Sequence, residues 1–144
     1  GGALLEQSHE IDYIQWIYKK INKIKYVRIK KLSKLKIDTE DSVIIVGKIG
    51  QANLIVDLNF FSLNAERLIT INGKNFTIKG DLINNTLKIN KGNKKKLLSF
   101  TINKDYTYKL QHEHLLKKKY QNSCTFIEGS NLMKLLDKIR NFNE

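Results

Sequence analysis

The sequence predicts an α+β fold: a mostly antiparallel, open sheet of about six or seven strands with helices packed on one face. Three observations support this prediction. Apolar residues recur at helical spacing near the start of the chain and again near its end. Between these segments, short runs rich in β-branched residues alternate with tight-turn signals. Strands and helices that are segregated along a sequence indicate the α+β class.

The first predicted helix covers residues 4–21. Its apolar stripe recurs at three- and four-residue steps and consists of Leu4, Ile11, Ile14, Tyr18 and Ile21. A second row on the same helix contains Leu5, His9, Asp12 and Trp16, so His9 and Asp12 are one turn apart on one face. Gly1 and Gly2 precede the helix at a point where the backbone can approach a ligand closely.

The middle of the chain predicts strands joined by short turns. The strands cover residues 24–31, 43–49, 52–61, 68–71, 76–79, 81–89 and 97–102. Turns are expected at Asp38-Thr39-Glu40-Asp41, Gly50, Asn72-Gly73 and Gly92-Asn93, with Asn84-Asn85 as a further candidate inside 81–89. Two helices close the chain: residues 106–120 with Asp105 as cap, and residues 131–142 with Ser130 as cap.

The 144 residues make one domain with a formal net charge of +12. The cations are 23 lysines and 3 arginines. A basic chain suggests a stand-alone module that binds nucleic acid or another anionic partner, and this remains the alternative function. Because arginine is the residue of bidentate phosphate and guanine recognition, its scarcity disfavours nucleic acid as a partner.

Several classes of protein and site are disfavoured. No apolar run approaches the ~18 residues of a membrane span, and no signal-peptide pattern is present. One cysteine allows neither an intramolecular disulfide nor a thiolate metal cluster, and we expect a reduced, cytoplasmic protein. His112 and His114 are two residues apart on a predicted helix, where side chains diverge by ~200°, so no metal site is predicted.

His9 and Asp12 are the strongest candidates for catalysis. A carboxylate one turn from a histidine can orient the ring and raise its basicity, which suits an acid–base histidine. The same spacing also occurs in helices whose His and Asp simply share a hydrogen bond, so spacing alone leaves both interpretations open.

The stretch from Gly1 through His9 and Asp12 to Trp16 resembles the start of the C-terminal domain of the Gfo/Idh/MocA oxidoreductases. In that family a glycine-rich, apolar and acidic segment leads into a His-x-x-Asp motif on the first helix after the dinucleotide domain. The resemblance continues through Asp38–Val43, Arg67–Lys74 and the tail with Tyr106 and Cys124–Glu128, and so covers nearly the whole chain.

This resemblance implies an NAD(P)-dependent oxidoreductase that acts on a sugar, polyol or related hydroxyl or carbonyl substrate. It implies that His9 and Asp12 are catalytic and that Glu6 and Gly2 contact substrate. Many members have an aspartate four residues before the histidine, whereas this chain has Leu5 there and its nearest acid is Glu6.

The resemblance also assigns NAD or NADP binding to a Rossmann half. The Glu-Lys-Pro motif and the glycine-rich phosphate loop of that Rossmann half are absent from this sequence, since it has no proline and no Gly-x-Gly-x-x-Gly. We therefore expect residues 1–144 to be a single C-terminal substrate-binding and oligomerisation domain. Such a fragment would lack its N-terminal dinucleotide-binding domain and would be inactive without it.

The strand pattern further predicts an oligomer. One side of the sheet carries Val43, Ile45, Leu54, Val56 and Leu58, which the helices can cover. The other side carries Ile44, Val46, Ile55, Phe60 and Ile71. In the family that this chain resembles, the open face packs against another subunit. We therefore expect a homodimer or tetramer through the open sheet face.

Overall fold

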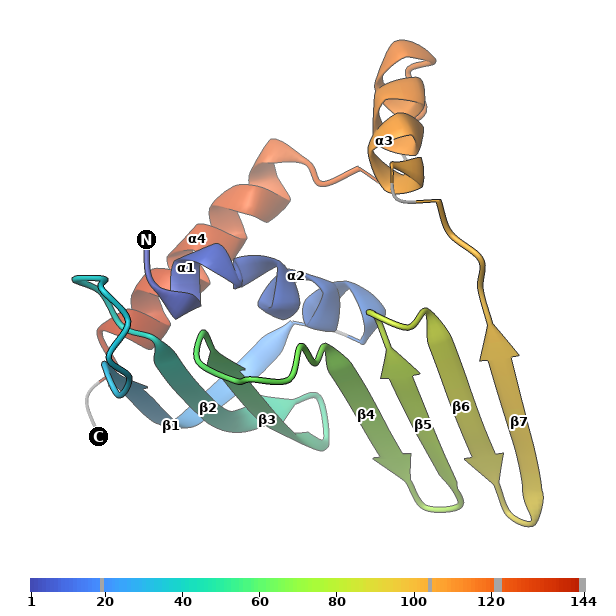
Figure 1. Ribbon diagram of the computed structural model, residues 1–144, viewed down its shortest axis with the longest axis horizontal. Coiled ribbons are helices and arrows are strands. Elements are labelled where there is room, and N and C mark those ends of the chain that lie inside the picture. The colour runs from blue at the N-terminus through green and yellow to red at the C-terminus, as the bar shows by residue number, and fades with distance from the viewer. Residues whose placement is uncertain (19, 104, 121–122, 143–144) are drawn as a thin grey trace. The chain divides into compact units, whose positions relative to one another are not determined.

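The computed structural model describes residues 1–18, 20–103, 105–120 and 123–142. In these residues, seven strands form two antiparallel sheets and four α-helices accompany them, which confirms the α+β class (Figure 1). The chain divides into two compact units. The first comprises Gly1–Phe61 and Cys124–Glu144, and the second comprises Ser62–Ser123.

The first unit is built on a three-stranded antiparallel sheet in the order β1-β2-β3. The strands are β1 (Ile21–Lys30), β2 (Ser42–Ile49) and β3 (Ala52–Asn59). Gly50 has φ +59° in the β2–β3 turn, a conformation in which glycine carries no steric penalty. The predicted inner residues Val43, Ile45, Leu54, Val56 and Leu58 are all buried.

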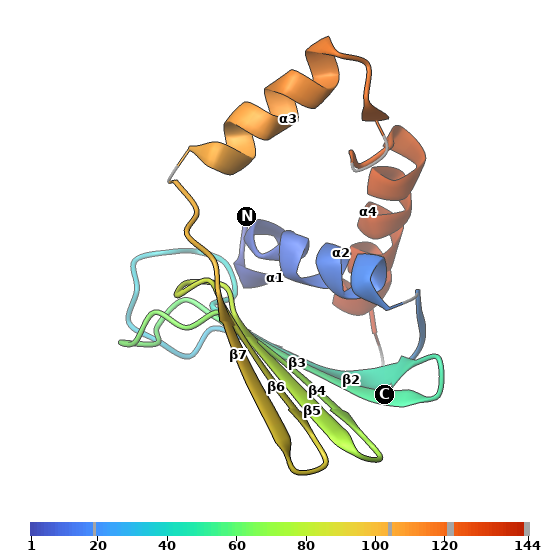
Figure 2. The ribbon, with the colours of Figure 1, turned by 90° about the vertical axis from the view of Figure 1, so that its right-hand side faces the viewer.

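Three helices of this unit lie over the inner face of the sheet (Figure 2). Helix α1 (Ala3–Glu6) contacts β2 and β3, and helix α4 (Phe126–Arg140) contacts β1 and helix α2 (Ser8–Ile17). Their buried residues Leu4, Ile11, Leu136 and Ile139 complete the core. Each such side chain contributes about 1.5–3 kcal/mol when it leaves water.

The single helix expected over 4–21 is in fact two helices that end earlier. Gln7 separates α1 from α2, and α2 ends at Ile17. Residue 21 already belongs to β1, where the side chain of Gln15 accepts a hydrogen bond from the Ile21 amide at 3.3 Å. The apolar spacing of Tyr18 and Ile21 continues the helical period, but these residues follow the end of the helix.

The last helix begins one turn earlier than expected. The last helix expected over 131–142 is present, but its expected start and its Ser130 cap are wrong, because α4 begins at Phe126 and Ser130 lies inside it. Thr125 caps the helix: its hydroxyl accepts a hydrogen bond from the Glu128 amide at 3.2 Å, and the Glu128 carboxylate accepts one from the Thr125 amide at 2.7 Å. This reciprocal capping box satisfies two amides that would otherwise lack partners.

The second unit contains a four-stranded antiparallel meander. Its strands are β4 (Leu68–Gly73), β5 (Phe76–Asp81), β6 (Thr86–Lys91) and β7 (Lys94–Ser99). The expected run 81–89 is divided by a turn, and Asn85 within it has φ +51°. Helix α3 (Tyr106–Leu116) follows, with Asp105 at its N-cap position but without a side-chain capping bond.

The second unit holds no fully buried hydrophobic side chain among its described residues. One face of its sheet carries apolar side chains that are only half-buried: Ile69, Ile71, Ile78, Leu87 and Ile89. The meander therefore depends on its hydrogen-bond ladders and cross-strand pairs more than on a packed core.

Asp41 is a fully buried carboxylate just before β2. It accepts hydrogen bonds from the Leu32 amide at 2.7 Å, the Ser33 amide at 2.9 Å, the Ser33 hydroxyl and Lys31 Nζ at 3.1 Å. Burial alone would raise the pKa of Asp41, but these hydrogen bonds outweigh it and hold the pKa well below its ordinary value.

We predict that Asp41→Asn lowers the melting temperature at pH 7 by roughly 5–10 °C, because an amide cannot accept all of these bonds. The folded-state pKa lies below the unfolded value of about 3.9, so the ionised form stabilises the fold above that pH and this stabilisation is lost in acid. Thermal denaturation from pH 2 to 7 measures both effects. Asp57→Asn, an exposed acid on β3, is the matched control. Equal melting curves for the two variants would contradict the prediction.

Candidate functional site

The segment that carries the predicted site residues is held at its start by Glu40. The Glu40 carbonyl accepts a hydrogen bond from the Ala3 amide at 3.0 Å, and its Oε1 accepts one from the Leu4 amide at 3.2 Å. Gly2 is buried, and a Cβ at this position would overlap the Glu40 carboxylate. Gly2, predicted to contact substrate, thus has a packing role in the structure, because the space beside it is filled by Glu40.

His9 lies near the start of α2 with its side chain 56% exposed. Its Nε2 is 3.0 Å from Glu10 Oε1, and Glu10 also accepts a hydrogen bond from the Tyr13 hydroxyl. The carboxylate against the ring is therefore Glu10, whereas the sequence spacing pointed to Asp12. Spacing rules missed Glu10 because adjacent helical residues do not normally face each other. The Glu10 side chain is 13% exposed, so it is well shielded from solvent.

Asp12 is half-buried on α2, a helix that contacts α4. Burial raises the pKa of the Cys124 thiol, and the negative charges of Asp12 and Glu128 raise it further. Asp12 thus acts electrostatically on a segment more than one hundred residues later in the chain. On the same helical row as His9 and Asp12, Trp16 is 75% exposed.

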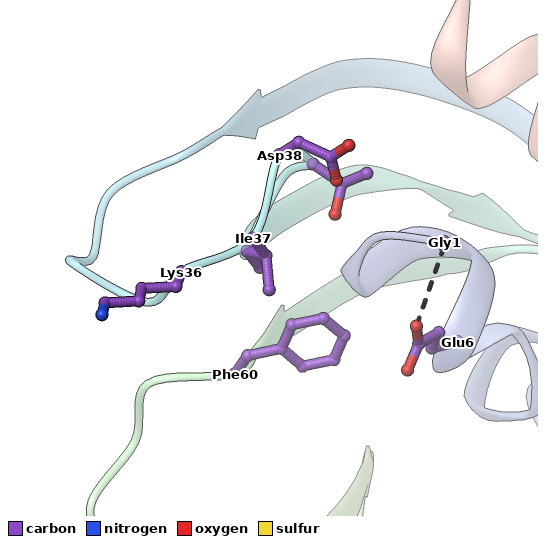
Figure 3. A pocket seen from close by; sticks show the side chains of 7 residues that line it. Gly1, Glu6, Lys36, Ile37, Asp38 and Phe60 are labelled. Atoms are coloured by element: carbon purple, nitrogen blue, oxygen red, sulfur yellow. Dashed lines mark ion pairs between the residues drawn. The ribbon is translucent and has the colours of Figure 1, made fainter.

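Glu6 lines an open pocket of about 870 Å³ in the first unit. The pocket is formed by Gly1, Glu6, the 36–39 segment and Phe60, whose ring faces the opening in Figure 3. The Glu6 carboxylate is 3.9 Å from the Gly1 amino group, and its side chain is 63% exposed. Carboxylates from Glu6 and Asp38, a hydroxyl from Thr39 and the flat Phe60 ring are groups that suit a hydroxyl-bearing ligand.

The four predicted site residues are thus divided between two places. Glu6 lies in the pocket, whereas Gly2, against Glu40, and His9 and Asp12, on α2, are not part of the pocket lining. No motif marked Lys36 as a site residue. The strand pattern predicted Phe60 on the open side of the sheet, which is wrong, because Phe60 packs against the buried core and lines this pocket. Among the described residues, no three His, Cys, Asp or Glu side chains gather as metal ligands. No helix in the described ranges is long and apolar enough to cross a membrane.

Several solved structures share this fold. The UDP-N-acetylglucosamine 3-dehydrogenase GnnA from Acidithiobacillus ferrooxidans superposes with a TM-score of 0.71 at 12% identity, over 92% of this chain and 44% of that one. YvaA from Bacillus subtilis, assigned as an oxidoreductase, superposes with a TM-score of 0.70 at 15% identity, over 97% of this chain and 48% of its own.

This chain therefore spans less than half the length of either structure. No family model and no curated protein matches the sequence. At these identities the likeness establishes the fold alone, which this chain shares with part of each of the two structures.

We predict that Gly2→Ala destabilises the chain by about 0.5–1.5 kcal/mol, since the new methyl group displaces Glu40 and breaks its bond to the Leu4 amide. In a Glu40→Ala background the same change should cost nothing further. A double-mutant cycle from urea denaturation measures this coupling. Additive costs of the two substitutions would show that Gly2 is needed for another reason.

Proposed function

We propose that this chain is the substrate-side domain of an NAD(P)-dependent oxidoreductase of the Gfo/Idh/MocA type. The enzyme would transfer a hydride between a nicotinamide and a carbon atom of a sugar, polyol or related hydroxyl or carbonyl substrate. This proposal depends on one observation: the fold matches that of oxidoreductase structures over 92–97% of the chain. Helix α2 of this fold carries the exposed His9.

The described residues of this chain do not fit a dinucleotide on their own. The seven strands pair antiparallel, and none leads through a glycine-rich loop into a helix, which is the usual phosphate-binding arrangement. NAD or NADP would accept or supply the hydride, held mainly by another domain of the enzyme.

His9 is the residue that we propose to carry the proton. When a hydroxyl is oxidised, its proton must leave as the hydride departs from the same carbon, and an imidazole can accept it. Glu10 engages Nε2 at 3.0 Å, which orients the ring and leaves Nδ1 for the substrate. Asp12, one turn further along α2, would hydrogen-bond a substrate hydroxyl or assist in orienting His9.

Glu6 is proposed to contact the substrate from the pocket. Its exposed carboxylate can accept hydrogen bonds from substrate hydroxyls, and Phe60 offers an apolar surface for the C–H face of a sugar ring. The name of GnnA, a UDP-N-acetylglucosamine dehydrogenase, supports a sugar-like substrate class.

In the enzyme that contains this domain, His9→Ala should lower kcat by about 10²–10⁴, the usual share of general acid–base catalysis. Glu10→Gln and Asp12→Asn should have smaller effects, because the imidazole remains. Stability should change by only about 0.5 kcal/mol, since the His9 side chain is 56% exposed. Steady-state kinetics measure kcat and urea denaturation midpoints measure stability, on the same variants.

His112→Ala is the matched control, because His112 is also exposed and its Nδ1 lies 2.8 Å from the Tyr108 carbonyl on α3. It should leave kcat unchanged. An unchanged kcat in His9→Ala would end the catalytic assignment, and a large loss of stability with unchanged turnover would assign His9 a structural role.

We also propose that the chain forms a homodimer or tetramer through the outer face of its first sheet. Tyr26, Val46 and Ile55 pair across the three strands on this face, and Ile44 lies beside them. Ile55 is 74% exposed and Tyr26 is 38% exposed. Apolar side chains grouped across three strands favour association with a like surface.

Ile55→Lys should shift the oligomer towards the monomer by at least about tenfold in dissociation constant, because a lysine must lose its hydration to enter an apolar interface. Light scattering across a concentration series measures the mass. Gln51→Lys adds the same charge in the exposed β2–β3 turn and should leave the mass unchanged. A monomeric wild-type chain at high concentration would refute the oligomer.

A further inference from the structure

The second unit carries most of the net positive charge of the chain. Between Ser62 and Ser123 the sequence has thirteen lysines and arginines against four acids. The four-stranded sheet has a polar face on which the register places Lys79 of β5 directly opposite Lys88 of β6, with Leu97 of β7 next to Lys88. The position of this lysine pair, rather than the total charge, requires an explanation.

Like charges directly opposite each other on neighbouring strands destabilise a sheet. Lysines on edge strands have a structural explanation, because they prevent edge-to-edge association; Lys94, Lys95 and Lys96 on the edge strand β7 fit this role. Lys79 and Lys88 instead lie on the two central strands. Within the described residues, neither ammonium group has a carboxylate within ion-pair distance.

These two lysines line a pocket of about 390 Å³ on that face, a volume suited to a small molecule. The other polar groups come from the 64–66 segment, from the facing ends of β5 and β6 and from the turn between these strands. They are Asn64, Glu66, Asp81, Asn84 and Thr86. The pocket belongs entirely to the second unit.

The Asp81 carboxylate in this pocket is already engaged by its own turn. It accepts hydrogen bonds from the Asn84 amide at 2.9 Å, the Asn84 side chain at 2.8 Å and the Ile83 amide at 3.0 Å. These bonds from Asn84 and Ile83, together with the charge of Lys79, lower the pKa of Asp81, while burial opposes them. With Asp81 committed to the turn, the ammonium groups of Lys79 and Lys88 remain available for a ligand.

We infer that this pocket binds the phosphate group of a small phosphorylated, hydroxyl-rich molecule, with Lys79 and Lys88 contacting the phosphate. An anion between the two ammonium groups removes their repulsion and forms charge-assisted hydrogen bonds with both. Asn64, Glu66 and Thr86 supply donors and acceptors for hydroxyl groups. This inference goes beyond the proposed oxidoreductase function and does not rest on it.

Calorimetric titration of the chain with inorganic phosphate, glucose 6-phosphate and glucose tests the inference at low salt and at physiological salt. We expect saturable binding of the two phosphates and none of glucose. The double variant Lys79→Gln/Lys88→Gln should weaken phosphate binding by about tenfold or more, as expected when two charged hydrogen-bond donors are lost. Its melting temperature should not fall, because the like-charge repulsion is also removed.

The matched control is Lys91→Gln/Lys94→Gln. These two lysines are also directly opposite in register and carry the same charge, but they lie beside the β6–β7 turn outside the pocket. They should change phosphate affinity by less than about twofold, the loss expected from distant, screened charges. Equal weakening by the two double variants would show non-specific attraction to the basic surface and overturn the inference. Glucose that binds as tightly as glucose 6-phosphate would also overturn the inference, and so would wild-type phosphate binding weaker than about 10 mM.

Discussion

Two consecutive carboxylates, Glu40 and Asp41, hold together the part of the first unit on which the candidate site depends. Asp41 binds the turn at residues 31–33 through its side chain, and its backbone hydrogen-bonds Lys30 at the end of β1 and Phe60 just after β3. Glu40 binds the first amides of α1. The orientation of the segment that carries Glu6 and His9, and the placement of Phe60 in the pocket, therefore follow from the backbone and side-chain bonds of these two residues. A buried carboxylate is stable here because each of its acceptor oxygens has donors, one of them a lysine.

The sequence predicted the elements that depend on local periodicity and turn chemistry. Alternation in 43–58 identified the buried face of the first sheet, and Gly50 and Gly92-Asn93 marked the turns of two hairpins. The turn expected at Asn72-Gly73 lies two residues later, because both residues belong to β4 and Gly73 pairs with Phe76 across the turn. The errors occurred where a periodic pattern continued beyond the end of its element, as at Tyr18 and Ile21, or where a local capping motif was overlooked. Thr125 and Glu128 have the spacing of a capping box, so this signal was present in the sequence.

The candidate site was predicted less completely than the fold. Helical spacing placed His9, Asp12 and Trp16 on one row of α2, but the partner of His9 is its neighbour Glu10, which adopts a rotamer that spacing does not reveal. Gly2 was marked as a position of close backbone approach, and the structure identifies the approaching group as Glu40, a residue 38 positions later in the sequence. Contacts of this range depend on tertiary packing, so a single sequence does not specify them.

The first unit is discontinuous in the chain, and this has a consequence for how the protein is made. Its core includes Leu136 and Ile139 from α4, whereas the second unit is inserted between β3 and that helix. During synthesis the part of the first sheet that α4 covers, at β1, stays exposed until α4 (Phe126–Arg140) has been translated. The hairpins of the second unit need only local contacts and can pair while they emerge from the ribosome. The inserted unit lengthens the loop that α4 must close, but the entropy of closure grows only slowly with length, so the main cost is the time for which apolar strands remain exposed to aggregation.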